Sequence, residues 1–247
     1  MKTKLYVQYE NGGYVNYQTN DLRQGAWFLD MEFIKCSASK MKKIVTRNDI
    51  VYGSIGYVEE ALKSLQIPIP KPHNPVDCIP SQLKRRVGIS NLGVVRSNVL
   101  GSIVDSPDFI KPLDTAKLFT GFVVRSQKDL QHIRMYPDET RVIVSEYVEF
   151  VSEYRVFVMY KRPVGIKHYK GDPFLFPPWG FDSIIKQAIE EYGDKQPAAY
   201  TIDYGFDYSG KWYLIEINDG YGFGAYGLNP TVLLSMCQAR FKELCKI

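Results

Sequence analysis

The stretch "AYTIDYGFDYSGKWYLIEINDG", residues 199–220, restricts the possible folds of this chain more than any other segment. Two runs of alternating apolar residues flank Ser209-Gly210, a dipeptide that closes tight hairpins because glycine supplies the positive φ of the turn. With these two residues as the loop, Asp203 lies directly opposite Glu216 in the second strand. The sequence therefore predicts an antiparallel hairpin in which two carboxylates face each other.

Side chains alternate between the two faces of a strand, so Asp203, Glu216 and Asn218 are expected on one face of this hairpin. The other, apolar face is expected to carry Tyr204, Phe206, Tyr213, Ile215 and Ile217. Facing like charges destabilise a sheet unless they are neutralised. Mg²⁺ would neutralise them, because it binds carboxylate and amide oxygens. The pattern alone leaves open a second interpretation, in which both carboxylates point into water.

The length and composition of the chain predict a globular protein with one large core or two to three lobes, since 45% of its 247 residues are hydrophobic. The balance of 31 basic against 27 acidic residues is too even to indicate a nucleic-acid partner. Neither a signal peptide nor a run of about 18 apolar residues occurs, so we expect a cytoplasmic protein without a membrane partner. Four cysteines without a Cys-x-x-Cys pair, and three histidines, favour neither a disulfide framework nor a zinc site.

The order of strand-like and helix-like segments divides the chain into three lobes. Residues 1–83 are expected to form an N-terminal α/β lobe, which begins with a strand over 3–9 and ends after the Pro-rich break "PIPKPHNP". Residues 84–148 form a central lobe and residues 149–247 a C-terminal lobe.

A second hairpin opens the C-terminal lobe. Its strands "EYRVFVMY" and "PVGIKHY" are joined at Lys161-Arg162. A two-residue loop at this point places Lys167 opposite Val156, with Arg155 on the other face.

Two helices of the same lobe have recognisable ends. "FDSIIKQAIEEYG" is expected to start at an Asp182 cap and to stop at Gly193. The last helix is expected to have Asn229 as its cap and Pro230 at its first position.

The segment "FIKPLDTAKLFTG" suits a polyphosphate. Lys111 ends a strand, and Lys117 lies just ahead of the turn at Thr120-Gly121. A lysine supplies a point charge, and a glycine-bearing turn exposes backbone N–H donors. The alternative is a pair of surface lysines beside an ordinary turn.

The segment "VIVSEYVEFVSEYRVFV" reads as a linker between two strands. Its free backbone groups at residues 146–148 could pair with the edge of a purine, while Glu149 or Glu153 accepts from ribose hydroxyls. The alternative is an ordinary acidic loop.

The lysine segment, the linker and the hairpin, in this order along the chain, resemble the motifs of the ATP-grasp superfamily. Within the superfamily, "FIKPLDTAKLFTGFVV" and "GIKHY" are most similar to the R2K clade. The shared features are a lysine in "IKP", a hinge in "EYV", a strand in "RVFV", and Asp203 followed thirteen residues later by the Glu of a Glu-x-Asn triplet. The resemblance spans residues 84–220. It implies an α+β ATP-grasp fold of three lobes, with the nucleotide held between two mixed or antiparallel β-sheet lobes.

The resemblance also implies a role for each motif residue. The nucleotide would be bound by Lys111 at the α- and β-phosphates, by Lys117, Thr120 and Gly121 as a lid, by Glu146, Tyr147 and Val148 at adenine, and by Glu149 or Glu153 at ribose. One or two Mg²⁺ ions would be bound by Asp203, Glu216 and Asn218. Arg155 and Lys167 would stabilise the transferred phosphoryl group, with Lys170 the second choice for the lysine.

The activity implied by the resemblance is that of an ATP-dependent carboxylate–amine ligase. Such an enzyme joins small-molecule or peptide substrates through an acyl phosphate and releases ADP and phosphate. A kinase of the same superfamily, or a non-catalytic ATP-binding module, would show the same motifs. The glycine-rich loop after Asn218 would contact substrate through Tyr221, Gly222 and Tyr226, although it also reads as a plain turn before a helix.

Overall fold

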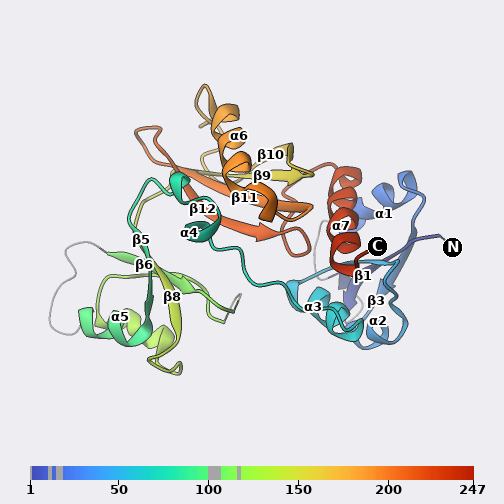
Figure 1. The fold of residues 1–247 in the computed structure, drawn as a ribbon, viewed down its shortest axis with the longest axis horizontal. Coiled ribbons are helices and arrows are strands. Elements are labelled where there is room, and N and C mark those ends of the chain that lie inside the picture. The colour runs from blue at the N-terminus through green and yellow to red at the C-terminus, as the bar shows by residue number, and fades with distance from the viewer. Residues whose placement is uncertain (1, 11–12, 15–18, 100–106, 116–117) are drawn as a thin grey trace.

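The structure, a computed structural model, describes residues 2–10, 13–14, 19–99, 107–115 and 118–247. Within these ranges three four-stranded sheets are present, one in each of three lobes (Figure 1). Every helix in the same ranges is too short or too polar to cross a membrane.

The first lobe is built on a mixed sheet with β1 at its centre. Strand β1 pairs in parallel with β3 and β4, and antiparallel with β2. Helix α1 packs against α7, and α2 packs against α3; Figure 1 shows these two pairs on opposite sides of the sheet. The elements are β1 (Lys4–Glu10), β2 (Gly13–Tyr14), α1 (Thr19–Phe28), β3 (Glu32–Cys36), α2 (Ala38–Ile44), β4 (Ile50–Tyr52) and α3 (Ile55–Ser64).

The central lobe is an antiparallel sheet of order β5-β8-β6-β7. Helix α5 and the 3-10 helix η2 cover it and enclose a core of its own, which includes Leu92, Ile110 and Val142. The short elements α4 (Pro75–Cys78) and η1 (Pro80–Gln82) lead into this lobe. Its elements are β5 (Val87–Asn91), α5 (Leu92–Val99), β6 (Asp108–Pro112), β7 (Phe122–Val124), η2 (Gln127–Ile133) and β8 (Arg141–Glu146).

The third lobe holds the antiparallel sheet β10-β9-β11-β12. Even-numbered residues of β9 and β11, such as Val156 and Ile202, pack under α6 in one core. The odd-numbered residues, Arg155 and Asp203 among them, therefore lie on the opposite face. The elements are β9 (Ser152–Met159), β10 (Arg162–Gly171), α6 (Phe181–Tyr192), η3 (Gly193–Lys195), β11 (Ala199–Phe206), β12 (Trp212–Asp219) and α7 (Pro230–Cys245).

Of the four residues predicted to mark helix ends, three are confirmed. Asn229 caps α7 by accepting from the N–H of Thr231 at 2.9 Å, and Pro230 is the first helical residue. Gly193 ends α6 at a φ of +63°. The Asp182 cap is wrong: Gly180 precedes the helix, and Asp182 lies in its first turn.

The predicted loop between β9 and β10 is wrong by one residue. Tyr160 and Lys161 form the turn, each at positive φ, and Arg162 already pairs with Met159. A β-bulge between Pro163 and Gly165 shifts the register further. As a result Lys167 lies directly opposite Arg155 rather than opposite Val156, which brings two cations to neighbouring positions of the sheet.

The hairpin β11–β12 keeps the predicted facing of Asp203 and Glu216. Its turn is longer than two residues, since Phe206 pairs with Trp212, and a bulge at Ile215 restores the register. This bulge places Ile215 beside Glu216 on the site face. The expected position of Ile215 and Tyr213 in the apolar face is therefore wrong; Leu214 is buried there instead.

The cores cross the predicted limits between lobes, which remain predictions. Helix α7 belongs to the core of the first lobe, together with Phe157 of β9 and Ala199 of β11. Ile79, in the segment before the central lobe, belongs to the core under α6. The first and third lobes thus share buried surface, whereas the central lobe has a separate core.

Candidate active site

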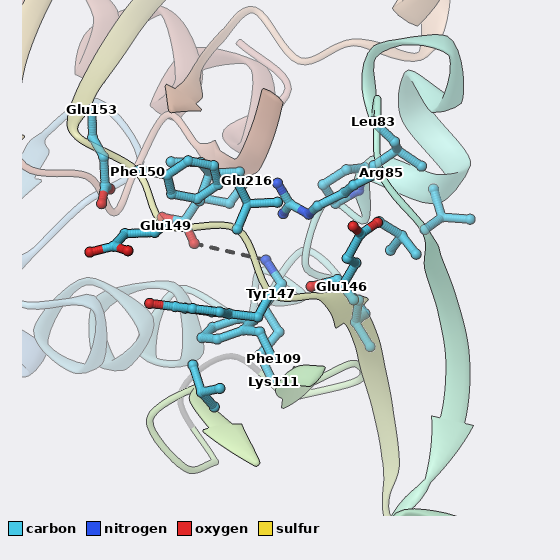
Figure 2. A pocket seen from close by; sticks show the side chains of 18 of the residues that line it. Leu83, Arg85, Phe109, Lys111, Glu146, Tyr147, Glu149, Phe150, Glu153 and Glu216 are labelled. Atoms are coloured by element: carbon cyan, nitrogen blue, oxygen red, sulfur yellow. Dashed lines mark ion pairs between the residues drawn. The ribbon is translucent and has the colours of Figure 1, made fainter. Parts of the chain in front are cut away.

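A cavity of about 480 Å³ lies between the central and third sheets. The linker from β8 to β9 forms one side of it, as Figure 2 shows. Its walls are mainly apolar, and the apolar lining residues are Pro75, Val76, Leu83, Val87, Phe109, Val123, Ile143, Val148, Phe150 and Ile215. A cavity of this size and lining suits a flat ring system with polar edges.

The linker supplies backbone groups to this cavity. The N–H of Glu146 donates to Arg86 at 2.8 Å and that of Tyr147 to Pro107 at 3.2 Å, so the first half of the linker is fixed. Across the described part of the chain, Val148 has no backbone hydrogen bond. Its N–H and C=O are therefore free to pair with the edge of a bound ring.

Lys111 and Glu216 meet inside the cavity, where they come from β6 and β12 (Figure 2). The Lys111 Nζ lies 3.9 Å from the Glu216 Oε2. Burial lowers the pKa of Lys111, and the charge of Glu216 opposes this shift. Burial acts to raise the pKa of Glu216, but Lys111, Asn218 and Arg155 outweigh it and the pKa is lowered. The cavity thus holds an ammonium and a carboxylate close to one another.

Arg85 is a site residue that the sequence analysis missed. Its side chain points into the cavity (Figure 2), where its Nε and one terminal nitrogen are buried without a hydrogen-bond partner among the described residues. Arg85 and Lys111 line the same cavity, and the charge of Arg85 acts to lower the pKa of Lys111. A buried guanidinium with unused donors fits an anion such as a phosphate. The run Lys84-Arg85-Arg86 was the available signal, but it did not reveal which side chain points inward.

Asp203 is engaged by Arg155. The guanidinium Nε and a terminal nitrogen donate to the two oxygens of Asp203 at 2.8 and 2.6 Å, and Asp203 is only 1% exposed. Burial raises the pKa of Asp203 to about 7, against the opposing effect of Arg155. Arg155 also lies 3.7 Å from Glu216, so one guanidinium joins both carboxylates.

The residues expected to bind Mg²⁺ fit it unequally. Glu216 is 37% exposed and lines the cavity, and Asn218 donates to its Oε1 at 2.8 Å. The two side chains are therefore adjacent, and their oxygen atoms could bind one divalent cation. Asp203 is 1% exposed and each of its oxygens accepts from Arg155, so a cation bound there would share these oxygens with the guanidinium. In the described residues no third histidine, cysteine or acidic group joins these two carboxylates.

Glu153 lines the cavity, yet both of its oxygens are engaged. Tyr169 donates to one at 2.7 Å, and Lys170 pairs with the other at 2.6 Å. Glu149 is exposed and also lines the cavity, without a hydrogen-bond partner in the described ranges. Of the two carboxylates considered for ribose, Glu149 is therefore the free one. Lys167 is half-buried on β10 and lies outside the cavity lining.

Tyr226 contacts Arg155 and Tyr169 and lies outside the lining of the first cavity. Its ring stacks on that of Tyr169 with centroids 4.9 Å apart, and the Arg155 guanidinium sits 4.9 Å from its centroid. The two rings and the ion pair to Asp203 fix the orientation of Arg155.

The expected phosphate lid is only partly described. Lys117 lies outside the described residues. Thr120 is exposed and Gly121 follows it, both outside the cavity lining. Gly121 is pressed against Phe109, since a Cβ at this position would come within 2.5 Å of the Phe109 ring.

The other two predicted substrate residues, Tyr221 and Gly222, line a second cavity of about 310 Å³. Asp219 lies in the same wall, directly after Asn218. Arg240 of α7 donates to the two Asp219 oxygens at 2.7 and 2.6 Å, and the His73 Nε2 lies 3.0 Å from one of them. This network ties the end of β12 to α7 and to the linker before the central lobe.

His73 makes the stability of the protein depend on pH. Burial acts to lower its pKa, but hydrogen bonds to Asp219 and Cys78 raise it to about 9. A raised pKa means that the charged form is favoured by folding, so this contribution is complete below about pH 6.5 and is lost as the pH rises through 9. We expect His73→Gln to lower the free energy of unfolding by up to about 3 kcal/mol more at low than at high pH. Urea unfolding at pH 6 and at about pH 9.5 measures the difference.

The exposed His132 is the matched control for His73, and His132→Gln should retain the pH dependence of the wild type. A stability loss in His73→Gln that is equal at both pH values would contradict a charged His73.

Residues 83–236 match the profile of a family described as "ATP-grasp domain, R2K clade family 2". A solved D-alanine–D-alanine ligase from Bacillus anthracis, complexed with ATP, superposes with a TM-score of 0.62 at 14% identity, over 100% of this chain and 99% of the other. A D-cycloserine synthetase gives 0.62 at 11% identity over 98% and 99% of the two chains. An ATP-grasp RimK domain protein from Sphaerobacter thermophilus gives 0.60 at 12% identity over 99% and 98%. These likenesses confirm the fold class expected from the sequence, while a comparison with curated proteins finds no match.

Proposed function

The chain belongs to family 2 of the R2K clade of ATP-grasp domains, and from this premise we propose that it is an ATP-dependent carboxylate–amine ligase. The observation that carries the proposal is the placement of Lys111, Arg85 and Glu216 in one cavity. The other walls of this cavity are mainly apolar, and the backbone N–H and C=O of Val148, free within the described residues, lie along it. Two cations and a carboxylate in this setting suit the triphosphate of ATP together with its Mg²⁺.

Each part of the nucleotide has a candidate partner. The adenine ring would lie in the apolar part of the cavity, with its edge at the backbone of Val148, and Glu149 would accept from ribose hydroxyls. Lys111 and Arg85 would bind phosphate oxygens. Glu216 and Asn218 would hold one or two Mg²⁺ ions, which supply neutralising charge to the triphosphate when bound.

The reaction joins a carboxylate to an amine in two steps. A carboxylate oxygen attacks the γ-phosphorus, the bond to the β-γ bridging oxygen breaks, and ADP leaves. The amine nitrogen then attacks the acyl carbon, loses a proton and displaces phosphate. Arg155 and Lys167, directly opposite on β9 and β10, are our candidates for binding the oxygens of the transferred phosphoryl group.

A screen for ADP release tests the proposed function. The purified protein is mixed with Mg-ATP and with pools of carboxylates and amines, in all combinations. We expect ADP only when a pool supplies both partners, with equal amounts of ADP, phosphate and amide. ADP formation with a hydroxyl compound alone, together with a phosphorylated product, would indicate a kinase instead.

Mg-ATP should also raise the melting temperature of the protein, because a ligand that binds only the folded state stabilises it. An unchanged melting temperature would contradict nucleotide binding.

A further inference from the structure

The second cavity points to the chemical class of one substrate. We propose that it binds a free amino acid, through Glu59 at the ammonium group and Lys71 at the carboxylate. This inference rests on the proposed ligase function. The cavity measures about 310 Å³ and lies next to Asn218, at the end of β12 that also carries Glu216. Residues of all three lobes line it, including Glu59 of α3, Lys71 of the Pro-rich linker, and Asp114, which follows β6.

Most charged groups around this cavity are already neutralised. Asp219 accepts from Arg240 and from His73, and Arg240 also pairs with Glu243 at 2.6 Å. Asp114 accepts from Arg141 at 3.2 Å. These groups therefore need no charged ligand.

Two charged side chains of opposite sign in the cavity lining have no such partner within the described part of the chain. Over the described residues, Glu59 and Lys71 line the cavity with neither a hydrogen bond nor an ion pair to another residue. Glu59 is half-buried, so its carboxylate is partly removed from water. Lys71 is exposed and lies between Pro70 and Pro72, whose rings restrict the backbone that presents it. The cavity thus offers one free acceptor for a cation and one free donor for an anion.

Glu59 lies beside the loop that follows β12. Glu59 and Tyr221 line the same cavity, and the charge of Glu59, together with burial and Asp219, raises the pKa of Tyr221. Gly222 is pressed against the first residue of α3, because a Cβ there would lie 2.8 Å from the Cγ1 of Ile55. The contact holds α3, and Glu59 with it, against the end of β12.

These features select a small zwitterion. A simple carboxylate would leave Glu59 without a partner, and a simple amine would leave Lys71 without one. The volume is near the lower end of ligand pockets, roughly 300–1,000 Å³, which suits a single amino acid. The position beside Asn218 places such a molecule next to the proposed phosphate site.

The first test compares ligands on the wild-type protein. Each of the common L-amino acids and its D-enantiomer is titrated calorimetrically in the presence of Mg-ADP, and each that binds is compared with its N-acetyl and carboxamide derivatives. We expect at least one amino acid to bind, and both derivatives to bind at least about 30-fold more weakly. Equal binding of the N-acetyl derivative, or binding of no amino acid, would overturn the proposal.

The second test uses Glu59→Gln with Glu60→Gln as its matched control. Glu60 is the next residue of α3, but its carboxylate pairs with Lys42 and Lys63 at the surface. Glu59→Gln should raise the KM for the amino acid at least about 30-fold, with little change in kcat or in the affinity for ATP. Glu60→Gln should leave all three unchanged. Equal KM values for Glu59→Gln and the wild type would overturn the role of Glu59.

The tests separate this inference from the proposed function. If the wild type releases ADP with carboxylates and amines that carry no second charge, the ligase activity stands and the amino-acid site is wrong. If Mg-ATP neither binds nor yields ADP with any substrate, the ligase proposal is itself wrong.

Discussion

Glu216→Gln is expected to lower the rate of ADP formation about 1000-fold, or about 4 kcal/mol in activation free energy. Glutamine keeps the size of the side chain but removes the charge that would hold Mg²⁺ near the triphosphate. It also leaves Lys111, 3.9 Å away, without its carboxylate neighbour. Folding should be retained, because Asp203 and Arg155 remain paired. Steady-state ADP release at saturating Mg-ATP measures the effect, and thermal melting checks the fold.

Glu190→Gln is the matched control for Glu216, since Glu190 is an exposed glutamate of α6 outside both cavities. It should retain the wild-type rate. An undiminished rate in Glu216→Gln would remove Glu216 from the metal site.

Lys111→Met is expected to weaken the binding of Mg-ATP about 100-fold, equivalent to about 2.7 kcal/mol. Methionine fills a similar volume but cannot donate to a phosphate oxygen. Arg85→Met should weaken binding in the same direction, because the guanidinium has buried donors without a partner among the described residues. Isothermal titration with a non-hydrolysable ATP analogue and Mg²⁺ measures both affinities.

Lys84→Met controls for the loss of a positive charge near the site. Lys84 precedes Arg85 directly, but it is exposed and lies over the Trp212 ring at 5.2 Å. Its replacement should change the affinity by less than about twofold. An equal loss in Lys84→Met and Arg85→Met would show that only net charge matters, and that Arg85 makes no direct contact with phosphate.

The facing carboxylates could be predicted because strand alternation is a local rule. Asp203 and Glu216 face each other as expected, although the hairpin differs from the predicted one. Its turn is longer than two residues, and the bulge at Ile215 offsets the resulting shift in strand register. A bulge depends on how the strand fits its neighbours, and this sequence carries no local signal for it. For that reason the orientations of Tyr213 and Ile215 were predicted wrongly.

Contacts between distant segments could not be predicted from one sequence. Arg155 and Asp203 are neighbours only because β9 pairs with β11. His73 reaches Asp219 across 146 positions of the chain, and no local pattern marks either partner. Arg85 was missed for a related reason, because the side that each residue of a basic run presents depends on the strand that follows it.

The membership of α7 in the first core bears on the order in which the chain folds. Leu233, Leu234 and Phe241 of this helix complete a core that begins with Leu5 in β1. All residues through α7 must therefore leave the ribosome before the first sheet can bury its apolar face. The central lobe, whose core is drawn from residues 92–142, is free to fold earlier. We expect that the central lobe becomes protease-resistant during synthesis before the first lobe does, the reverse of the usual N-to-C order.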